Sequence, residues 1–129
     1  MVALTMQMTT LEVGKKLVEL CSQGKNHEAQ ETLYSQDITS VEAGAPPGKS
    51  RESEGLKAIS AKSQWWAENH TIHSASVEGP WPHDNQFIVK FKYDVTFKPE
   101  NKRFTMEEAA LFTVSNGKIV KEQFFYAMG

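Results

Sequence analysis

The sequence predicts an α+β domain in which three N-terminal helices pack on one face of a mainly antiparallel sheet. Two observations carry this prediction. Apolar residues recur at helical spacing up to about residue 70, and from Thr71 onward they alternate with polar ones. A run of helices followed by a run of strands is typical of α+β folds. The 129 residues, 40% of them hydrophobic, match the size of one compact domain.

Two helices open this domain, which is expected to span residues 1–129, with residues 1–9 as a disordered extension. Thr9 and Glu12 lie three residues apart and form a capping-box pattern for the first helix, which is expected to end at Gly24. Asn26 can cap a second, shorter helix that Tyr34 closes. The apolar face of the first helix consists of Val13, Leu17, Leu20 and Cys21.

A short strand and a loop separate these helices from the third. The strand is expected over Ile38–Glu42, and residues 43–51 are too rich in Pro, Gly and charge for a helix or strand. Gly55 precedes the third helix. One stripe of that helix turns Trp66 toward the sheet and leaves Trp65 on the flank, although a rotation by one position would exchange them. The stripe consists of Leu56, Ile59, Ser63, Trp66 and His70.

Long strands then follow as a meander. They are expected over residues 71–82, 86–98, 103–114 and 119–126, with turns at Asp84-Asn85 and at residues 115–117. Between residues 86 and 98, every second residue is apolar and most of the others are polar. Each strand is therefore expected to turn one face toward the helices and the other away from them.

Charge and composition narrow the choice of partners and location. The formal net charge of −2 comes with both signs mixed along the chain, so nucleic acid is not an expected partner. No apolar run approaches the roughly 18 residues of a membrane span, and residues 1–10 lack the pattern of a signal peptide. Cys21 is the sole cysteine, which excludes an intrachain disulfide and suits a reducing compartment. We therefore expect a cytoplasmic protein without a membrane partner.

Motifs for cofactors, metals and covalent catalysis are missing from the sequence. It contains no Gly-rich phosphate loop, no Ser-x-x-Lys, no Gly-x-Ser-x-Gly and no Cys/His cluster. His70 and His73 are three residues apart, but they straddle the end of a helix and the start of a strand, which is not the spacing of a helical metal pair. We therefore expect neither a cofactor nor a metal.

Several short motifs, taken in order, resemble a known family. LYSQDI precedes the short strand, a Pro/Gly loop follows, EGLKAI opens the third helix, and NGKIVKEQFFY lies near the end. This order resembles the SnoaL-like branch of the nuclear transport factor 2-like superfamily over residues 10–127. The resemblance implies a cone-shaped barrel, in which a strongly curved sheet wraps around the helices and leaves a pocket between them.

The same resemblance implies a range of activities rather than one. Members include polyketide cyclases, ketosteroid isomerases, epoxide hydrolases and dehydratases, beside members that only bind or assemble. The general base of the ketosteroid isomerases falls on Glu42, or on Ala43 if one residue is inserted. Their oxyanion-hole tyrosine and aspartate fall near Leu17 and Ala110, which are apolar. Steroid isomerisation is therefore disfavoured, and function has to be argued from the pocket.

Four titratable residues are candidates for acid–base catalysis because the strand alternation turns them inward. They are Glu42, Glu108, Glu122 and His73. A carboxylate among apolar groups has a raised pKa, as a general acid or base requires, and histidine titrates near neutral pH. The alternatives are a rim carboxylate that reaches solvent or pairs with a basic group such as Lys62, and a hydrogen-bonded core histidine.

Aromatic residues and one lysine are candidates for ligand contacts. Aromatic rings could line the pocket and their polar atoms orient a ligand, whereas the alternative is ordinary core packing. The lysine could hold an anionic group or extend into solvent. The candidate ligand-binding residues are Lys62, Trp65, Trp66, Tyr93, Phe124 and Tyr126.

Three functions remain open from the sequence. The first is a cofactor-free enzyme of the cyclase, isomerase or dehydratase type that moves protons on a small hydrophobic or carbonyl-containing molecule. The second is a protein that binds such a molecule without turnover. The third is a dimeric assembly module with a vestigial cavity. A homodimer is expected in any case, because Ile88, Ile119 and Phe125 are assigned to the sheet face opposite the pocket.

Overall fold

The computed structural model describes residues 7–127 and confirms the α+β fold. Residues 1–6 of the predicted extension lie outside the described residues, and Met8 packs against the core. The helices are α1 (Thr10–Ser22), α2 (Asn26–Leu33), α3 (Leu56–Asn69) and the short 3₁₀ helix η1 (Lys98–Glu100). The strands are β1 (Tyr34–Val41), β2 (Glu52–Glu54), β3 (His70–His83), β4 (Gln86–Phe97), β5 (Lys102–Ser115) and β6 (Lys118–Phe125).

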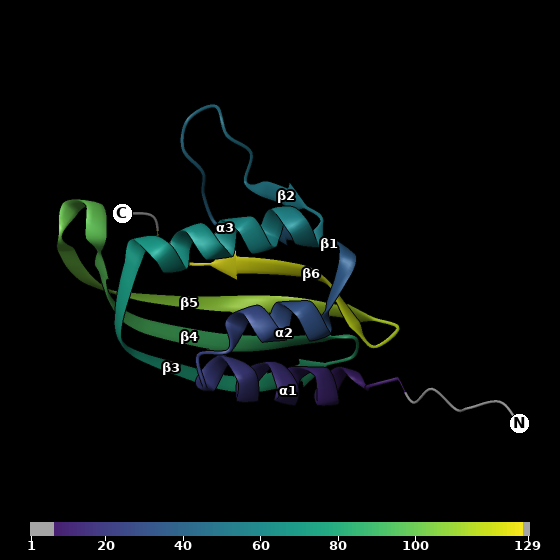
Figure 1. The fold of residues 1–129 in the computed structure, drawn as a ribbon. Coiled ribbons are helices and arrows are strands. Elements are labelled where there is room, and N and C mark those ends of the chain that lie inside the picture. Colours follow the sequence, from purple (N-terminus) through teal and green to yellow (C-terminus); the bar gives the residue numbers. More distant parts are fainter. Residues whose placement is uncertain (1–6, 128–129) are drawn as a thin grey trace, which may run out of the picture.

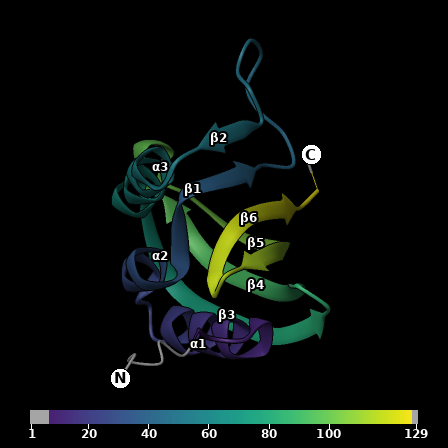
Figure 2. The same cartoon turned by 90° about the vertical axis from the view of Figure 1, so that its right-hand side faces the viewer.

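The described strands form one curled, six-stranded sheet in the order β2-β1-β6-β5-β4-β3. The pairing of β1 with β6 is parallel, and the other neighbouring strands are antiparallel. Figures 1 and 2 show α1, α2 and α3 along the concave side of this sheet. The predicted cone is therefore present as an open sheet, with β2 and β3 as its two edges.

Helix α1 closes one half of the concave face. Its start is the predicted capping box, in which Thr9 and Glu12 each accept a hydrogen bond from the backbone N–H of the other. Gly14 allows a close approach, because a Cβ there would lie 2.8 Å from Cβ of Pro80. Of α1, the buried residues are Val13, Gly14, Leu17, Leu20 and Cys21. The helical spacing thus translates directly into a packed face.

The β1–β2 region differs from the prediction in extent. Strand β1 begins at Tyr34 rather than Ile38, because its first half runs beside β6 in the parallel pairing. The three-residue β2 was not predicted, since Glu52–Glu54 is polar and too short to show a period. Figure 1 shows the intervening loop, residues 42–51, rising beyond the sheet edge.

The prediction that His73 points inward is wrong. The register between β3 and β4 shifts between Ile72 and Ser74, which leaves His73 as an extra residue and reverses the alternation there. Its side chain is exposed, and Nε2 lies 2.7 Å from Oγ1 of Thr96.

The outward assignment of Ile119 is also wrong. A second register shift, between Thr113 and Val114 on β5, places the extra residue on β6 at Val120. Ile119 therefore faces the core and is 0% exposed, whereas Ile88 and Phe125 are exposed as predicted. Within residues 7–127, no helix combines the length and apolarity that crossing a membrane requires.

Candidate functional site

A cavity of about 560 Å³ lies between the helices and the concave sheet face. Its walls are mainly apolar and come from all three long helices and from strands β1, β4, β5 and β6. Every predicted site residue except His73 lines it. These are Glu42, Lys62, Trp65, Trp66, Tyr93, Glu108, Glu122, Phe124 and Tyr126.

Glu42 lies directly after β1, and both of its carboxylate oxygens accept hydrogen bonds. Lys62 Nζ on α3 donates to Oε1 at 2.9 Å, and the Tyr126 hydroxyl beyond β6 donates to Oε2 at 2.9 Å. Burial and this hydrogen bond to Glu42 raise the pKa of Tyr126 to about 12, so its hydroxyl keeps its proton at neutral pH. Glu42 is thus part of a three-residue polar cluster with Lys62 and Tyr126.

Glu122 is held by two hydroxyl groups inside the core. The Tyr34 hydroxyl donates to Oε1, and Ser40 Oγ donates to Oε2 at 2.7 Å. Glu122 is 3% exposed. Burial raises the pKa of its carboxyl, although the two hydrogen bonds act in the opposite direction. Its polar partners satisfy it, so it is suited to a fixed structural or electrostatic role.

Glu108 differs from both, because its carboxyl has no hydrogen-bond partner among residues 7–127. It lies on β5 opposite Phe91 of β4, on the concave face. Burial, and then the negative charges of Glu42 and Glu122, raise the pKa of Glu108 to about 7. A free carboxyl at the wall of a cavity, half-ionised near neutral pH, can accept a proton and return it.

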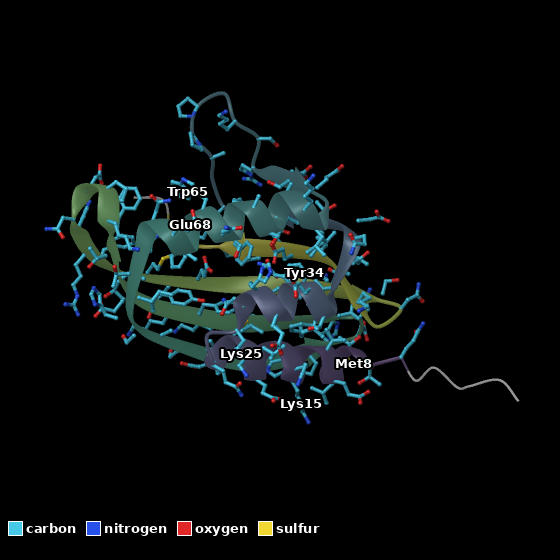
Figure 3. All side chains as sticks on the ribbon, in the orientation of Figure 1. Met8, Lys15, Lys25, Tyr34, Trp65 and Glu68 are labelled. Atoms are coloured by element: carbon cyan, nitrogen blue, oxygen red, sulfur yellow. The ribbon has the colours of Figure 1, made fainter. Side chains whose placement is uncertain are left out.

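Aromatic rings form the wall near the end of α3. Trp66 stacks on His70 with ring centroids 4.2 Å apart, and it meets Tyr93 at 5.7 Å with an angle of 53°. The backbone oxygen of Trp66 also lies 2.7 Å from Nδ1 of His70. Trp65, labelled in Figure 3, is 54% exposed, and its ring lies 6.4 Å from that of Phe97. Both tryptophans line the cavity, but only Trp66 has its ring enclosed by aromatic neighbours.

Sequence reasoning missed the polar residues that α2 and β1 supply. Burial raises the pKa of the Tyr93 hydroxyl, and Asn26, which also lines the cavity, acts in the opposite direction. Gln30, one turn further along α2, also lines the cavity, and its Oε1 is buried without a hydrogen-bond partner in the described chain. Tyr34 and Ser40, the partners of Glu122, were missed because nothing local signals the parallel pairing of β1 with β6. The helical spacing of Asn26 and Gln30 was the one available signal.

The thiol of Cys21 and the positions of possible metal ligands complete the description of the cavity. In residues 7–127, no group of three or more His, Cys, Asp or Glu side chains is placed to hold a metal ion. Cys21 lines the cavity, but burial, together with the charge of Glu122, raises the pKa of its thiol to about 12. A neutral thiol of this kind is a poor nucleophile. The cavity therefore offers acid–base groups and an apolar surface.

A family comparison and a related crystal structure both identify the chain as SnoaL-like. The sequence profile described as the SnoaL-like domain matches residues 8–126. A crystal structure from Mesorhizobium loti is 47% identical, with a TM-score of 0.87, and the match covers 92% of this chain and 100% of that one. That protein is provisionally assigned as a SnoaL-like polyketide cyclase, with carbohydrate phosphatase as a second description. No protein of curated function matches the sequence.

More distant structures share the fold. A provisionally assigned isomerase from Bacillus subtilis is 16% identical, with a TM-score of 0.73, over 93% of this chain and 90% of that one. A protein with a ketosteroid isomerase-like fold from Catenulispora acidiphila, in complex with trimethylamine, is 21% identical. Its TM-score is 0.69, over 93% of this chain and 88% of that one. At these identities the likeness extends to the fold alone.

Proposed function

The chain belongs to the SnoaL-like family of the nuclear transport factor 2-like superfamily, and from that premise we propose that it is a cofactor-free acid–base enzyme. Its substrate is a small, mainly apolar molecule that carries a carbonyl group, and the reaction is of the cyclase, isomerase or dehydratase type. The observation that carries this proposal is the Glu108 carboxyl, which lines the cavity without a partner and has a pKa of about 7.

Glu108 is proposed as the general base. A base works best when its pKa lies near the working pH, because the ionised form is then abundant and the proton can still be returned. The carboxylate would remove a proton from the carbon next to the substrate carbonyl and deliver it to a second position. Glu42 is less suited to this role, since Lys62 and Tyr126 already occupy both of its oxygens.

The Lys62–Glu42–Tyr126 cluster is proposed to stabilise the substrate oxygen. Lys62 carries three N–H donors, and one of them is used by Glu42. A remaining donor can meet the oxygen on which negative charge develops during proton removal. Glu42 fixes the lysine in place, so the donor needs little reorganisation when the substrate binds. Aromatic walls such as Trp66 and Tyr93 would hold the apolar body of the substrate.

Hydrogen–deuterium exchange tests proton transfer without knowledge of the natural substrate. We would incubate the protein with a panel of enolisable cyclic ketones in D₂O and follow deuterium incorporation next to the carbonyl by NMR. Catalysed exchange is expected to increase as the pH rises through about 7, because Glu108 becomes ionised. Glu108→Gln should lower the catalysed rate by about a hundredfold, the usual contribution of a general base.

Glu107→Gln is the matched control for this experiment. Glu107 is the preceding residue on β5, is exposed and lies 3.7 Å from Lys92, so its replacement should leave the exchange rate unchanged. Undiminished exchange in Glu108→Gln would rule Glu108 out as the base. Thermal stabilisation by a ketone that never exchanges would instead identify a binding protein without turnover.

We also propose that two copies pair through the convex face of the sheet. Trp81, Ile88 and Phe125 are 52%, 42% and 49% exposed and line a shallow groove there. Large apolar patches on a protein surface commonly mark an interface. Light scattering at micromolar concentration should give the mass of a dimer, and Ile88→Asp should give that of a monomer. A monomeric mass for the unmodified chain would refute this pairing.

A further inference from the structure

Carboxyl groups outnumber cationic side chains in the walls of the cavity. Glu42, Glu108 and Glu122 all line the cavity, and Lys62 is the one lysine or arginine among the lining residues. Lys62 is committed to Glu42 at 2.9 Å. Buried charges in proteins are normally paired. An ionised Glu108 therefore has no counter-charge of its own among residues 7–127.

Aromatic faces meet beside this carboxylate. Trp66 and Tyr93 form a corner, with ring centroids 5.7 Å apart and planes inclined by 53°. Tyr93 pairs with Met106, two residues before Glu108 on β5, so Tyr93 and Glu108 are diagonal neighbours on the concave face. The negative charge of Glu108 also contributes to the raised pKa of Tyr93. Faces of tryptophan and tyrosine attract cations, and more strongly when water is excluded.

Glu108 supplies the free acceptors beside this corner. No donor among residues 7–127 hydrogen-bonds its carboxyl, whereas both oxygens of Glu42 and both of Glu122 accept hydrogen bonds. Hydrogen bonds between a carboxylate and a charged N–H donor are among the strong ones. The Glu108 carboxylate is therefore suited to a ligand that brings N–H groups.

We infer that the cavity takes a ligand whose cationic end is a protonated amine, held in the Trp66–Tyr93 corner beside Glu108. An ammonium group meets all three requirements at once, since it supplies positive charge, N–H donors and a partner for aromatic faces. This inference rests on the proposed function for the location of the ligand, and it adds an amine to the chemical groups that the cavity can hold.

A matched pair of probes separates charge from shape. Cyclohexylamine, which is protonated at pH 8, and cyclohexanol have the same ring, and both can donate a hydrogen bond. Titration calorimetry at pH 8 should give at least tenfold tighter binding for the amine. Glu108→Gln should reduce that preference to about twofold or less, and Glu107→Gln should retain it. Equal affinities for the two probes, or a preference that survives Glu108→Gln, would overturn the inference.

Proton linkage provides a second readout. The groups that face Glu108 are Glu42, Glu122, Tyr93 and Tyr126, with Lys62 acting through Glu42. A cation bound among them lowers the pKa of Glu108, so binding releases a proton near pH 7 and the affinity rises between pH 6 and pH 8. Calorimetry in two buffers of different ionisation enthalpy measures this release. Amine binding without proton release would contradict a site beside Glu108.

The amine-binding experiment can succeed or fail independently of the exchange experiment. If cyclohexylamine fails to bind while neutral ketones still exchange in a Glu108-dependent way, the ligand class is wrong and the proposed acid–base function stands. If the amine binds as expected and no ketone exchanges, the ligand class stands and the catalytic proposal fails.

Discussion

Helices α1 and α3 cover the same concave sheet face, yet one packs against it and the other leaves a cavity. Helix α1 is fixed by a capping box and buries five of its residues. Helix α3 starts at Gly55 without a side-chain cap, and of its residues, all of them described, Ile59 alone is buried. Figure 2 shows the two helices at opposite ends of the curled sheet. The cavity is therefore open where α3 packs less closely, and Leu17 and Cys21 of α1 complete its wall on the other side.

The two regions also differ in the groups they enclose. Beside α1 the core is apolar, with Phe87 stacked on Phe112, a residue at the border of the cavity, at a centroid distance of 5.0 Å. Under α3 the wall contains charged residues, including Glu42, Lys62 and Glu108. Polar groups placed in a partly buried wall reduce stability, and proteins retain them mainly at functional sites. Each prediction below tests this difference between a packed half and a functional half.

The largest effect is expected for Leu20→Ala on α1. Leu20 is buried and does not line the cavity, so its loss should leave a void and lower the free energy of unfolding by about 3 kcal/mol. Urea denaturation followed by circular dichroism measures the change. Leu56→Ala, at a half-buried position of α3, is the matched comparison and should cost about 1 kcal/mol. Equal costs would show that α3 is packed as tightly as α1.

The same division explains which features the sequence predicted. The capping box, the buried stripe of α1 and the inward position of Glu108 follow from spacing within one element, and all are present in the structure. The partners of Glu122 could not be predicted in this way. Tyr34 and Ser40 are 88 and 82 residues away from it, and the parallel pairing of β1 with β6 alone brings them close.

Bulges limited the prediction elsewhere. His73 is itself an extra residue in β3, and Ile119 lies beside an extra residue in β6. A shift of one residue turns a side chain to the opposite face of the sheet. Nothing in the local sequence separates these positions from a regular strand. The orientation of the two tryptophans of α3 was easier to predict. The α3 stripe identified Trp66 as the enclosed ring, and Trp65 lines the cavity as well.

Glu108→Gln is expected to change the free energy of unfolding by an intermediate amount, and to raise it where Leu20→Ala lowers it. The pKa of Glu108 is about 7 in the folded protein and 4.5 for an ordinary glutamate, so the unfolded chain ionises first and folding loses stability as the pH rises from 4.5 to about 7. Removing this carboxyl should therefore stabilise the protein at pH 8 by about 2 kcal/mol, after allowance for partial solvent access. Below pH 4 the variant and the unmodified protein should be equally stable.

Urea titrations at pH 4 and pH 8 measure that difference, with Glu107→Gln as the control that should change neither value. A destabilised Glu108→Gln at pH 8 would mean that the carboxylate is already satisfied in the folded state. The carboxyl would then cost the folded protein no stability, which would weaken the argument for Glu108 as the general base.

The smallest effect on stability is expected for Trp65→Phe. Trp65 is 54% exposed, and exposed positions usually change stability by no more than about 0.5 kcal/mol. Trp66→Phe should cost about 1 kcal/mol, because its ring is stacked on His70 and meets Tyr93. In fluorescence titrations with cyclohexylamine, the signal change should persist in Trp65→Phe and largely vanish in Trp66→Phe. The reverse pattern would place the ligand at the mouth beside Trp65, and the enclosed corner would then be packing rather than a binding surface.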